Sequence, residues 1–390
     1  MIKKEAVIVG AGPAGLGAAI ELAKRGVQVL LIDENHRAGG QLFKQIHKFF
    51  GSQEHNAGVR GFRIAEKLME QVQGLGVELW LDSAVVGVFP NKELLVRRNH
   101  PDGADTVSIC AQKLLLATGG AENSIRFPGW TLPGVMGAGA AQTMVNVNRV
   151  LPGKRILMVG SGNVGLIVSY QLMQAGADVV GIVEAADHIG GYGVHAAKVK
   201  RLGVDYYLGY SILRAEGEND RVCRATIAKL DGKGGFLAQT EKTFSIDTLC
   251  LAVGLRPLTD LIYPAGIQQA FVRNLGGWMP IHDEHMMTLS EGIYVAGDVT
   301  GVEEANTALD EGRLAGLAIT ETLGKGSHEE VKSEMQLVSE RLKTLRQGPF
   351  GIKREEAKER IIQAAHSTPN QQILDSELGE RSLLFRKGMV

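Results

Sequence analysis

Residues 5–33 read EAVIVGAGPAGLGAAIELAKRGVQVLLID, and this stretch decides the fold. A short β-branched run (residues 6–9) leads into a glycine-rich turn, a stretch with helical periodicity (14–25) follows, and a second apolar run (27–32) closes the unit. This order predicts a strand, a crossing helix and a second parallel strand. We therefore expect an α/β chain that begins with a Rossmann-like unit.

The turn inside this stretch has the spacing of a phosphate-binding loop. It reads Gly10-Ala11-Gly12-Pro13-Ala14-Gly15, in which Gly12 lets a pyrophosphate approach the backbone and Gly15 lets the helix pack on the strand. Asp33 ends the second strand, where a carboxylate can accept both ribose hydroxyls. An ordinary glycine turn is the alternative, but the strand, the spacing and the acid together disfavour it. The predicted first dinucleotide site comprises Gly10, Gly12, Pro13, Ala14, Gly15, Asp33 and Glu34.

The same pattern returns at residues 154–184, with a second glycine motif at 160–165 and Glu184 at the end of the following strand. A carboxylate there suits the 2′-hydroxyl of NADH and repels the 2′-phosphate of NADPH. We expect NAD(H) or another adenine nucleotide, although a domain kept only as scaffold is the alternative. The residues assigned to this second site are Gly160, Gly162, Asn163, Val164, Gly165 and Glu184.

Composition narrows the range of partners. The chain has 390 residues, enough for two or three domains, and 42 basic against 43 acidic residues give a net charge of −1 without long runs of either sign. We therefore expect a small-molecule substrate and no nucleic-acid partner. Because no apolar stretch resembles a signal peptide or is long enough to span a bilayer, we expect a cytoplasmic protein without a membrane span.

Cysteine and histidine usage points away from thiol and metal chemistry. Cys110, Cys223 and Cys250 show no C-x-x-C spacing, which argues against a dithiol redox centre and a zinc knuckle. The run 282–285 reads His-Asp-Glu-His, but neighbouring positions on an extended segment point to opposite faces. We expect a solvated loop there, and no metal site.

Further motifs resemble those of one flavoprotein superfamily. They are the Gly39-Gly40-Gln41 turn, the strand end Ala117-Thr118-Gly119, and Gly297-Asp298 after an apolar run. With the first glycine motif, they make residues 1–325 similar to the two-dinucleotide-binding-domain flavoproteins, the pyridine nucleotide-disulfide oxidoreductase superfamily. This resemblance implies non-covalent FAD that carries the chemistry itself, so no catalytic side chain is assigned. It adds Gly40, Gln41, Ala117, Thr118, Gly119, Gly297, Asp298, Asn306 and Thr307 to the FAD site.

The resemblance also implies the domain organisation. We expect two Rossmann-like three-layer domains, with an NAD(P)-type domain at 127–253 inserted between FAD-domain parts at 1–126 and 254–328. A charged, helix-forming tail should occupy 329–390, with Leu337, Leu342 and Leu345 near helical spacing. We assign no chemistry to this tail.

A narrower resemblance concerns segments 39–50 and 127–135, which look like the nucleotide-binding subunits of sarcosine oxidase, proline and hydroxyproline dehydrogenase, opine oxidase and hydrogen cyanide synthase. Many members of this branch hold a [2Fe–2S] cluster on C-terminal cysteines. Because the tail after Glu329 has no cysteine, we expect separate subunits to carry the cluster and a second flavin. The alternatives are a free-standing NADH-dependent reductase and a nucleotide-bound assembly subunit without turnover. The substrate, the direction of electron flow and the stoichiometry stay open.

Overall fold

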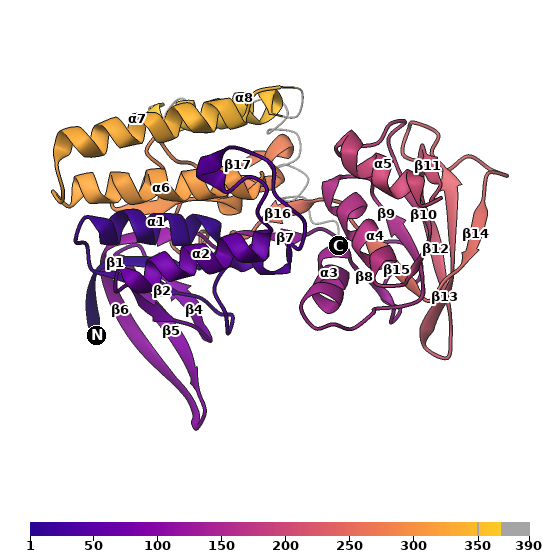
Figure 1. Ribbon diagram of the computed structural model, residues 1–390, viewed down its shortest axis with the longest axis horizontal. Helices are drawn as coiled ribbons and strands as arrows, with labels where there is room; N and C mark the ends of the chain where they lie inside the picture. The colour runs from indigo at the N-terminus through magenta and orange to yellow at the C-terminus, as the bar shows by residue number, and fades with distance from the viewer. Residues whose placement is uncertain (349–350, 368–390) are drawn as a thin grey trace. The chain divides into compact units, whose positions relative to one another are not determined.

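The chain folds into two compact units, seen in a computed structural model that describes residues 1–348 and 351–367 (Figure 1). The first unit comprises Met1–Ala121 and Arg256–Val390, and the second comprises Glu122–Leu255. The chain passes between them along β7 (Gly120–Glu122) and β16 (Leu255–Pro257). The second unit is thus an insertion, and the stretch expected at 127–253 lies inside its bounds.

A seven-stranded sheet in the order β3-β2-β1-β6-β5-β4, with β19 paired to β6, organises the first unit. Its strands are β1 (Ile2–Val9), β2 (Val29–Ile32), β3 (Glu78–Trp80), β4 (Ser83–Val88), β5 (Glu93–His100), β6 (Gly103–Leu116) and β19 (Ile293–Val295). β1 is parallel to both neighbours, with Val7 opposite Leu30 of β2 and Leu114 of β6. Apolar residues fill the second half of β1, the whole of β2 and the end of β6, as expected for parallel strands covered on both faces.

Helices α1 (Pro13–Lys24), α2 (Gly61–Gly74) and α6 (Ala305–Thr322) pack against one face of this sheet. α1 and α6 approach closely, because a Cβ on Gly312 would overlap the backbone of Ala14 and one on Gly316 would meet Ala18. Both helices begin beside the sheet's carboxyl edge, where nucleotides bind in such folds.

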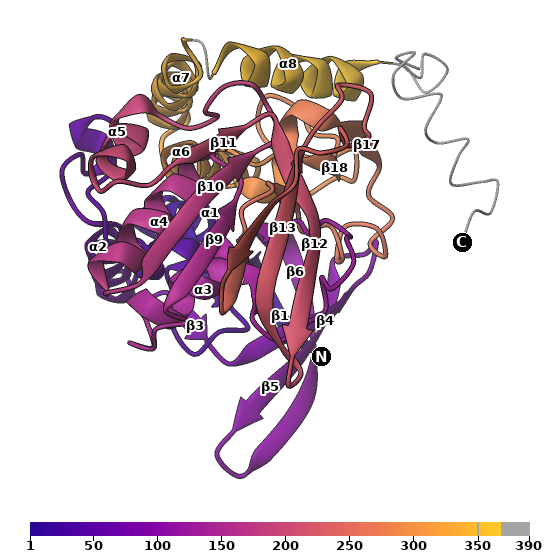
Figure 2. The ribbon, with the colours of Figure 1, turned by 90° about the vertical axis from the view of Figure 1, so that its right-hand side faces the viewer.

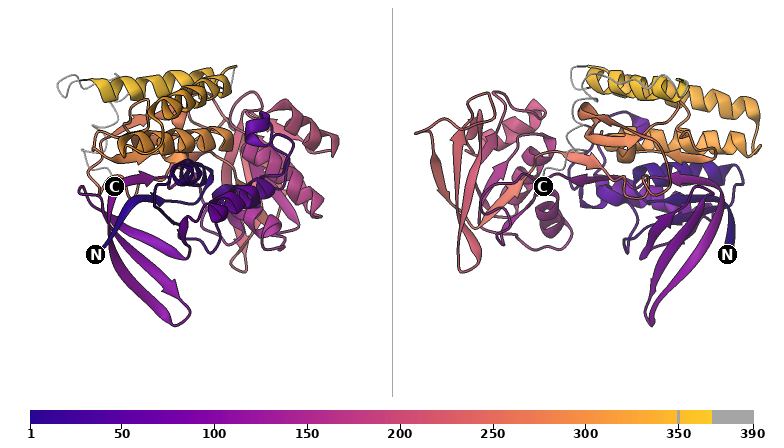
Figure 3. Two further views of the ribbon diagram at one scale, coloured as in Figure 1. Left: turned by 60° about the vertical axis from the view of Figure 1, so that its left-hand side comes forward. Right: turned by 180° about the vertical axis from the view of Figure 1, so that it is seen from behind.

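The β5–β6 hairpin extends beyond the helical layer in both views of Figure 3. Its far half is antiparallel, with His100 opposite Gly103 at the tip, whereas the near half of β6 joins the parallel core. The other short elements of the unit are η1 (Gly40–Lys44), η2 (Gln53–His55), β17 (Gln269–Val272), η3 (Arg273–Leu275), β18 (Gly277–Pro280) and η4 (Asp298–Thr300).

The second unit has three layers of its own (Figure 2). A parallel sheet β11-β10-β9-β15-β8 is covered by helices on one face and by the antiparallel sheet β12-β13-β14 on the other. The elements are β8 (Val135–Gly137), α3 (Ala138–Asn146), β9 (Arg155–Val159), α4 (Asn163–Gln174), β10 (Asp178–Glu184), α5 (Gly193–Arg201), β11 (Tyr206–Leu208), β12 (Tyr210–Glu218), β13 (Arg221–Lys229), β14 (Lys242–Ser245) and β15 (Thr248–Leu251). The predicted α/β class with two Rossmann-like units is confirmed.

The C-terminal tail forms α7 (His328–Leu345) and α8 (Ile352–His366), and α7 packs against α6 (Figure 1). Of the three leucines noted at helical spacing, Leu342 is buried, Leu345 is half-buried and Leu337 is 54% exposed. The other buried positions of α7 are Val331, Met335 and Val338. Among the described residues, no helix is long and apolar enough to cross a membrane.

Candidate functional site

The first glycine loop connects β1 to α1 and leaves its backbone open at one point. Gly10 has φ 105°, and a Cβ there would overlap the carbonyl oxygen of Ala117. Gly12 precedes α1 as its N-cap, and a Cβ there would meet only the Cα of Gly40, at 3.9 Å. The free N–H groups of a helix N-terminus can bind an anion. The space at Gly12 is therefore suited to a pyrophosphate.

The acid at the end of β2 is already tied to this loop. Asp33 is buried, and its Oδ2 accepts the backbone N–H of Ala11 at 2.6 Å. Its Oδ1 accepts the backbone and side-chain N–H groups of Asn35, each at 2.9 Å. Since an ionised carboxylate offers about four acceptor positions, a ribose hydroxyl can still be bound. The neighbouring Glu34 is exposed.

All the motifs assigned to the first site converge on the start of α1. The N–H of Gly39 donates to the carbonyl of Ala11 at 2.7 Å, and a Cβ on Gly40 would lie 2.8 Å from the Cα of Gly12. The strand end 117–119 continues β6, and its Thr118 hydroxyl donates to the carbonyl of Leu258. A Cβ on Gly297 would lie 2.9 Å from that of Ala14. Gln41 is exposed beside this cluster.

Asp298 lies beside the strand end 117–119, because a Cβ on Gly120 would be 3.4 Å from the Cβ of Asp298. Burial raises the pKa of Asp298 to about 7, and the carboxylates of Glu311 and Glu303 act in the same direction. The N–H of Glu303 (3.4 Å) and the charge of Lys358 oppose this increase. Asp298 as a whole residue is partly exposed.

Asn306 and Thr307, which the resemblance adds to the FAD site, lie in the first turn of α6, which begins at Ala305. The side chains of its first turn are engaged within the protein. Asn306 donates to the carbonyl of Phe50 at 2.9 Å, and the Thr307 hydroxyl donates to the carbonyl of Glu304 at 2.6 Å. The first backbone N–H groups of a helix have no partner within it, and these are the groups that can meet a ligand.

The second glycine loop, between β9 and α4, repeats the first in detail. Gly160 has φ 108° and a Cβ there would overlap the carbonyl of Ala252, while one on Gly162 would meet nothing within 4 Å. Gly165 packs against the carbonyl of Gly160, as Gly15 packs against that of Gly10. Val164 is 36% exposed.

The acid of the second loop has the same role as Asp33. Glu184 accepts the backbone N–H of Ser161 at 2.8 Å and its hydroxyl at 2.7 Å through Oε2, and the N–H of Ala186 at 3.0 Å through Oε1. Asn163 is engaged elsewhere, since its side-chain oxygen accepts the N–H of Tyr192 at 2.8 Å.

Comparison with known proteins agrees with these two loops. Residues 4–312 match the family "pyridine nucleotide-disulphide oxidoreductase". The chain belongs to this family. It is 31% identical over 337 residues to the hydrogen cyanide synthase subunit HcnB of Pseudomonas aeruginosa, covering 80% of this chain and 70% of the relative. It is 28% identical over 342 residues to an opine oxidase subunit of Rhizobium meliloti, covering 82% and 72%.

Among solved structures, the chain resembles L-proline dehydrogenase from P. horikoshii, with a TM-score of 0.64 and 24% identity. The match covers 86% of this chain and 59% of that one, and it shows a shared fold. Membership of the pyridine nucleotide-disulphide oxidoreductase family implies FAD and NAD(P) binding.

The double glycine Gly190-Gly191 was not among the residues predicted for the second site. The N–H of Gly191 donates to the carbonyl of Ser161 at 2.9 Å, and the N–H of Gly190 donates to its hydroxyl at 3.0 Å. This double glycine therefore covers the second loop as the 39–40 turn covers the first. The signal was present, because each double glycine begins six residues after its acid (33 to 39, 184 to 190).

The run 282–285 and Cys250 were both noted in the sequence, and the structure shows how far each is buried. The run 282–285 is only partly the solvated loop that was expected: Glu284 and His285 are exposed, but His282 is 2% exposed and its Nδ1–H donates to the carbonyl of Asp283 at 2.9 Å. Burial, together with the charge of Lys358, lowers the pKa of His282 to about 4. Cys250 is a core residue, and burial raises the pKa of its thiol to about 12.

Proposed function

We propose that the chain is an FAD-dependent oxidoreductase in which the first glycine loop holds FAD non-covalently. The convergence of four sequence motifs on the open backbone of Gly12 carries this proposal. The residues fit the cofactor, because a Cβ at Gly12 would fill the space where a pyrophosphate approaches. Asp33 would accept an adenosine ribose hydroxyl, and Asp298 would accept a hydroxyl of the ribityl region.

When bound, the flavin supplies hydride and electron transfer, and the protein positions it and sets the local electrostatics. The backbone N–H groups that begin α6 form the positive end of a helix dipole. Such an end favours negative charge on a reduced isoalloxazine ring. The hydroxyl of Thr118 donates to Leu258 and so fixes the strand end that carries Gly119. No side chain in this scheme acts as a nucleophile.

For the second site, we propose NAD(H) or another adenine nucleotide bound on the loop that begins at Gly160. The open space at Gly162 and the carboxylate of Glu184 support this assignment. The residues after Glu184 are Ala185, Ala186 and Asp187, which offer no cation for a 2′-phosphate. This composition favours NADH over NADPH.

The chemistry fits a nucleotide-binding subunit of a heteromeric amine or amino-acid dehydrogenase that oxidises CH–NH or CH–NH2 donors. Two relatives are named as subunits, one of hydrogen cyanide synthase and one of opine oxidase. A [2Fe–2S] cluster and a second flavin would then belong to partner subunits in the cytoplasm. The second candidate, a free-standing NADH-dependent reductase, is favoured by the intact loop and acid of the inserted unit.

Anaerobic titration separates these candidates. The purified chain should contain FAD that heat releases, and either NADH or an amino-acid donor should bleach its absorbance. Bleaching by NADH without partner proteins favours the reductase, whereas bleaching by amines only in a co-purified complex favours the dehydrogenase subunit. Released FMN, flavin that stays attached after denaturation, or no bleaching by any donor would contradict the proposed oxidoreductase.

A further inference from the structure

The C-terminal helices supply cations to two adjacent buried acids of α6. Asp310 is fully buried. Its carboxylate accepts two hydrogen bonds from Arg341 of α7, at 2.9 and 3.1 Å, and one from Arg313 at 2.8 Å. Its neighbour Glu311 is 2% exposed, and its carboxylate accepts hydrogen bonds from Arg346 at 2.6 Å and from Lys358 at 2.7 Å. A buried carboxylate needs such partners, since an unpaired buried charge is strongly unfavourable.

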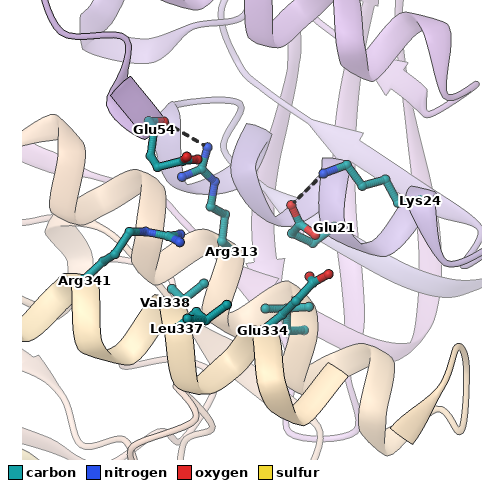
Figure 4. A pocket seen from close by; sticks show the side chains of 9 residues that line it. Glu21, Lys24, Glu54, Arg313, Glu334, Leu337, Val338 and Arg341 are labelled. Atoms are coloured by element: carbon teal, nitrogen blue, oxygen red, sulfur yellow. Dashed lines mark hydrogen bonds and ion pairs between the residues drawn. The ribbon is translucent and has the colours of Figure 1, made fainter. Parts of the chain in front are cut away.

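The shallow pocket between α1, α6 and α7 shows how α7 is attached (Figure 4). It has a volume of about 180 Å³, and Arg313 and Arg341 enter it from opposite helices. Both guanidinium groups are bound to Asp310, and Glu334 of α7, which also lines the pocket, pairs with Arg25. These ion pairs join the helices, so we assign the pocket to the docking of α7 and not to a ligand.

Glu311 links the tail to the proposed flavin turn. Its Oε2 accepts the backbone N–H of Gly297 and the hydroxyl of Thr300, both at 2.9 Å, while its Oε1 holds the two cations of the tail. Lys358 of α8 also donates directly to the Thr300 hydroxyl at 2.6 Å. Gly297 has φ 79°, and this backbone conformation presents Asp298. One carboxylate therefore connects both tail cations to the residue beside Asp298.

Lys358 and Arg346 reach the flavin turn as buried groups and not as surface ion pairs. Lys358 is 2% exposed although it lies on a helix whose other lysine, Lys353, is exposed. Arg346 makes a bidentate pair with Glu303, at 2.7 to 3.1 Å, and the N–H of Glu303 in turn reaches Asp298. The tail cations therefore contact the turn by two separate routes, one through Glu311 and one through Glu303.

We propose that Lys358 and Arg346 are positioning residues of the flavin site, so that α7 and α8 form part of the cofactor-binding structure. This inference rests on the proposed binding of FAD at Gly297 and Asp298. The two cations hold Glu311, Glu311 holds the Gly297 turn, and the turn presents Asp298 to the cofactor. Their positive charge also offsets the acids Glu303 and Glu311 near the flavin.

The test compares Lys358→Met with Lys353→Met in the full-length chain. Lys358→Met removes one charge-assisted bond to Glu311, so the dissociation constant for FAD should rise about tenfold. The loss of a positive charge should also shift the flavin reduction potential to a more negative value at saturating FAD. Lys353→Met removes the same charge from the exposed face of α8 and should change neither quantity.

Each outcome decides a different point. If wild-type protein binds no FAD, the proposed function fails. If Lys358→Met is folded and matches wild type in FAD affinity and potential, the positioning role alone fails. A lower melting temperature with an unchanged potential at saturating FAD would mean that Lys358 is merely structural, and it would also overturn the inference. Should Lys358→Met not fold, Glu303→Gln weakens the Arg346 route without removing a cation: the dissociation constant for FAD should rise, and the reduction potential at saturating FAD should shift to a more positive value because an acid is lost. An unchanged FAD affinity and potential in this variant would overturn the inference.

Discussion

At the residue scale, the sequence predicts which positions need glycine but not what the polar side chains bind. The motif spacing correctly places Gly10 and Gly160 in turns that no Cβ would fit. The hydrogen bonds of Asn163 with Tyr192 and of Asn306 with Phe50 could not be predicted, because these partners lie far away in the chain. Such pairings depend on tertiary packing, which leaves no periodic signal in one sequence.

The role proposed for Glu184 leads to a prediction at this scale. Glu184→Ala should weaken NADH binding by roughly tenfold to a hundredfold, because charge-assisted hydrogen bonds to the ribose are lost. It should also relax the discrimination against NADPH, since the like-charge repulsion disappears. Calorimetry with both nucleotides measures each effect.

Asp187→Ala is the matched control, because it removes a nearby carboxylate whose side chain is 97% exposed. It should leave NADH affinity unchanged, and FAD should stay bound in both variants. Equal NADH affinity in Glu184→Ala and wild type would contradict the assignment. Wild-type protein that binds ADP or ATP but no nicotinamide would show that the site takes another adenine nucleotide.

At the element scale, helical periodicity predicts that α7 exists but leaves its buried face ambiguous. The apolar stripe that contains Val338 and Leu342 packs against α6, whereas Leu337 lies outside that stripe and is exposed. The ion pair of Arg341 with Asp310 fixes the same rotation of the helix. The tail was predicted to be charged and helical, and one of its charged residues, Arg341, attaches it to α6 through the ion pair with Asp310.

This choice of face predicts a contrast between two leucines of α7. Leu342→Ala removes a side chain that is 5% exposed and leaves a cavity, so it should lower the free energy of unfolding by about 2–5 kcal/mol. Leu337→Ala truncates a side chain that is 54% exposed and should change it by less than about 0.5 kcal/mol. Urea denaturation followed by circular dichroism compares the two, and equal losses would mean that the helix packs on a different face.

At the scale of the whole molecule, the chain uses one loop design twice. In each unit, a glycine with positive φ meets a small-residue strand end, an acid binds the first loop N–H, and a double glycine covers the loop. Sequence periodicity could predict the loop and the acid in both units. The covering turn at Gly190 was not predicted, although its spacing from Glu184 repeats that of Gly39 from Asp33, because the sequence alone does not show what this double glycine contacts.

Since each loop is built inside its own unit, the two nucleotide sites should be separable by mutation. Gly12→Val places a branched side chain in the space that a pyrophosphate needs, so this variant should lose FAD and its yellow colour while it still binds nucleotide at the second loop. Gly162→Val makes the same change in the open space of the second unit, so it should keep a full complement of FAD and lose nucleotide binding. Flavin absorbance per chain and nucleotide calorimetry on both variants complete the comparison, and each variant is the other's control for folding. Loss of both ligands in either variant would contradict independent sites, and a yellow Gly12→Val protein at full stoichiometry would show that FAD does not bind at the first loop.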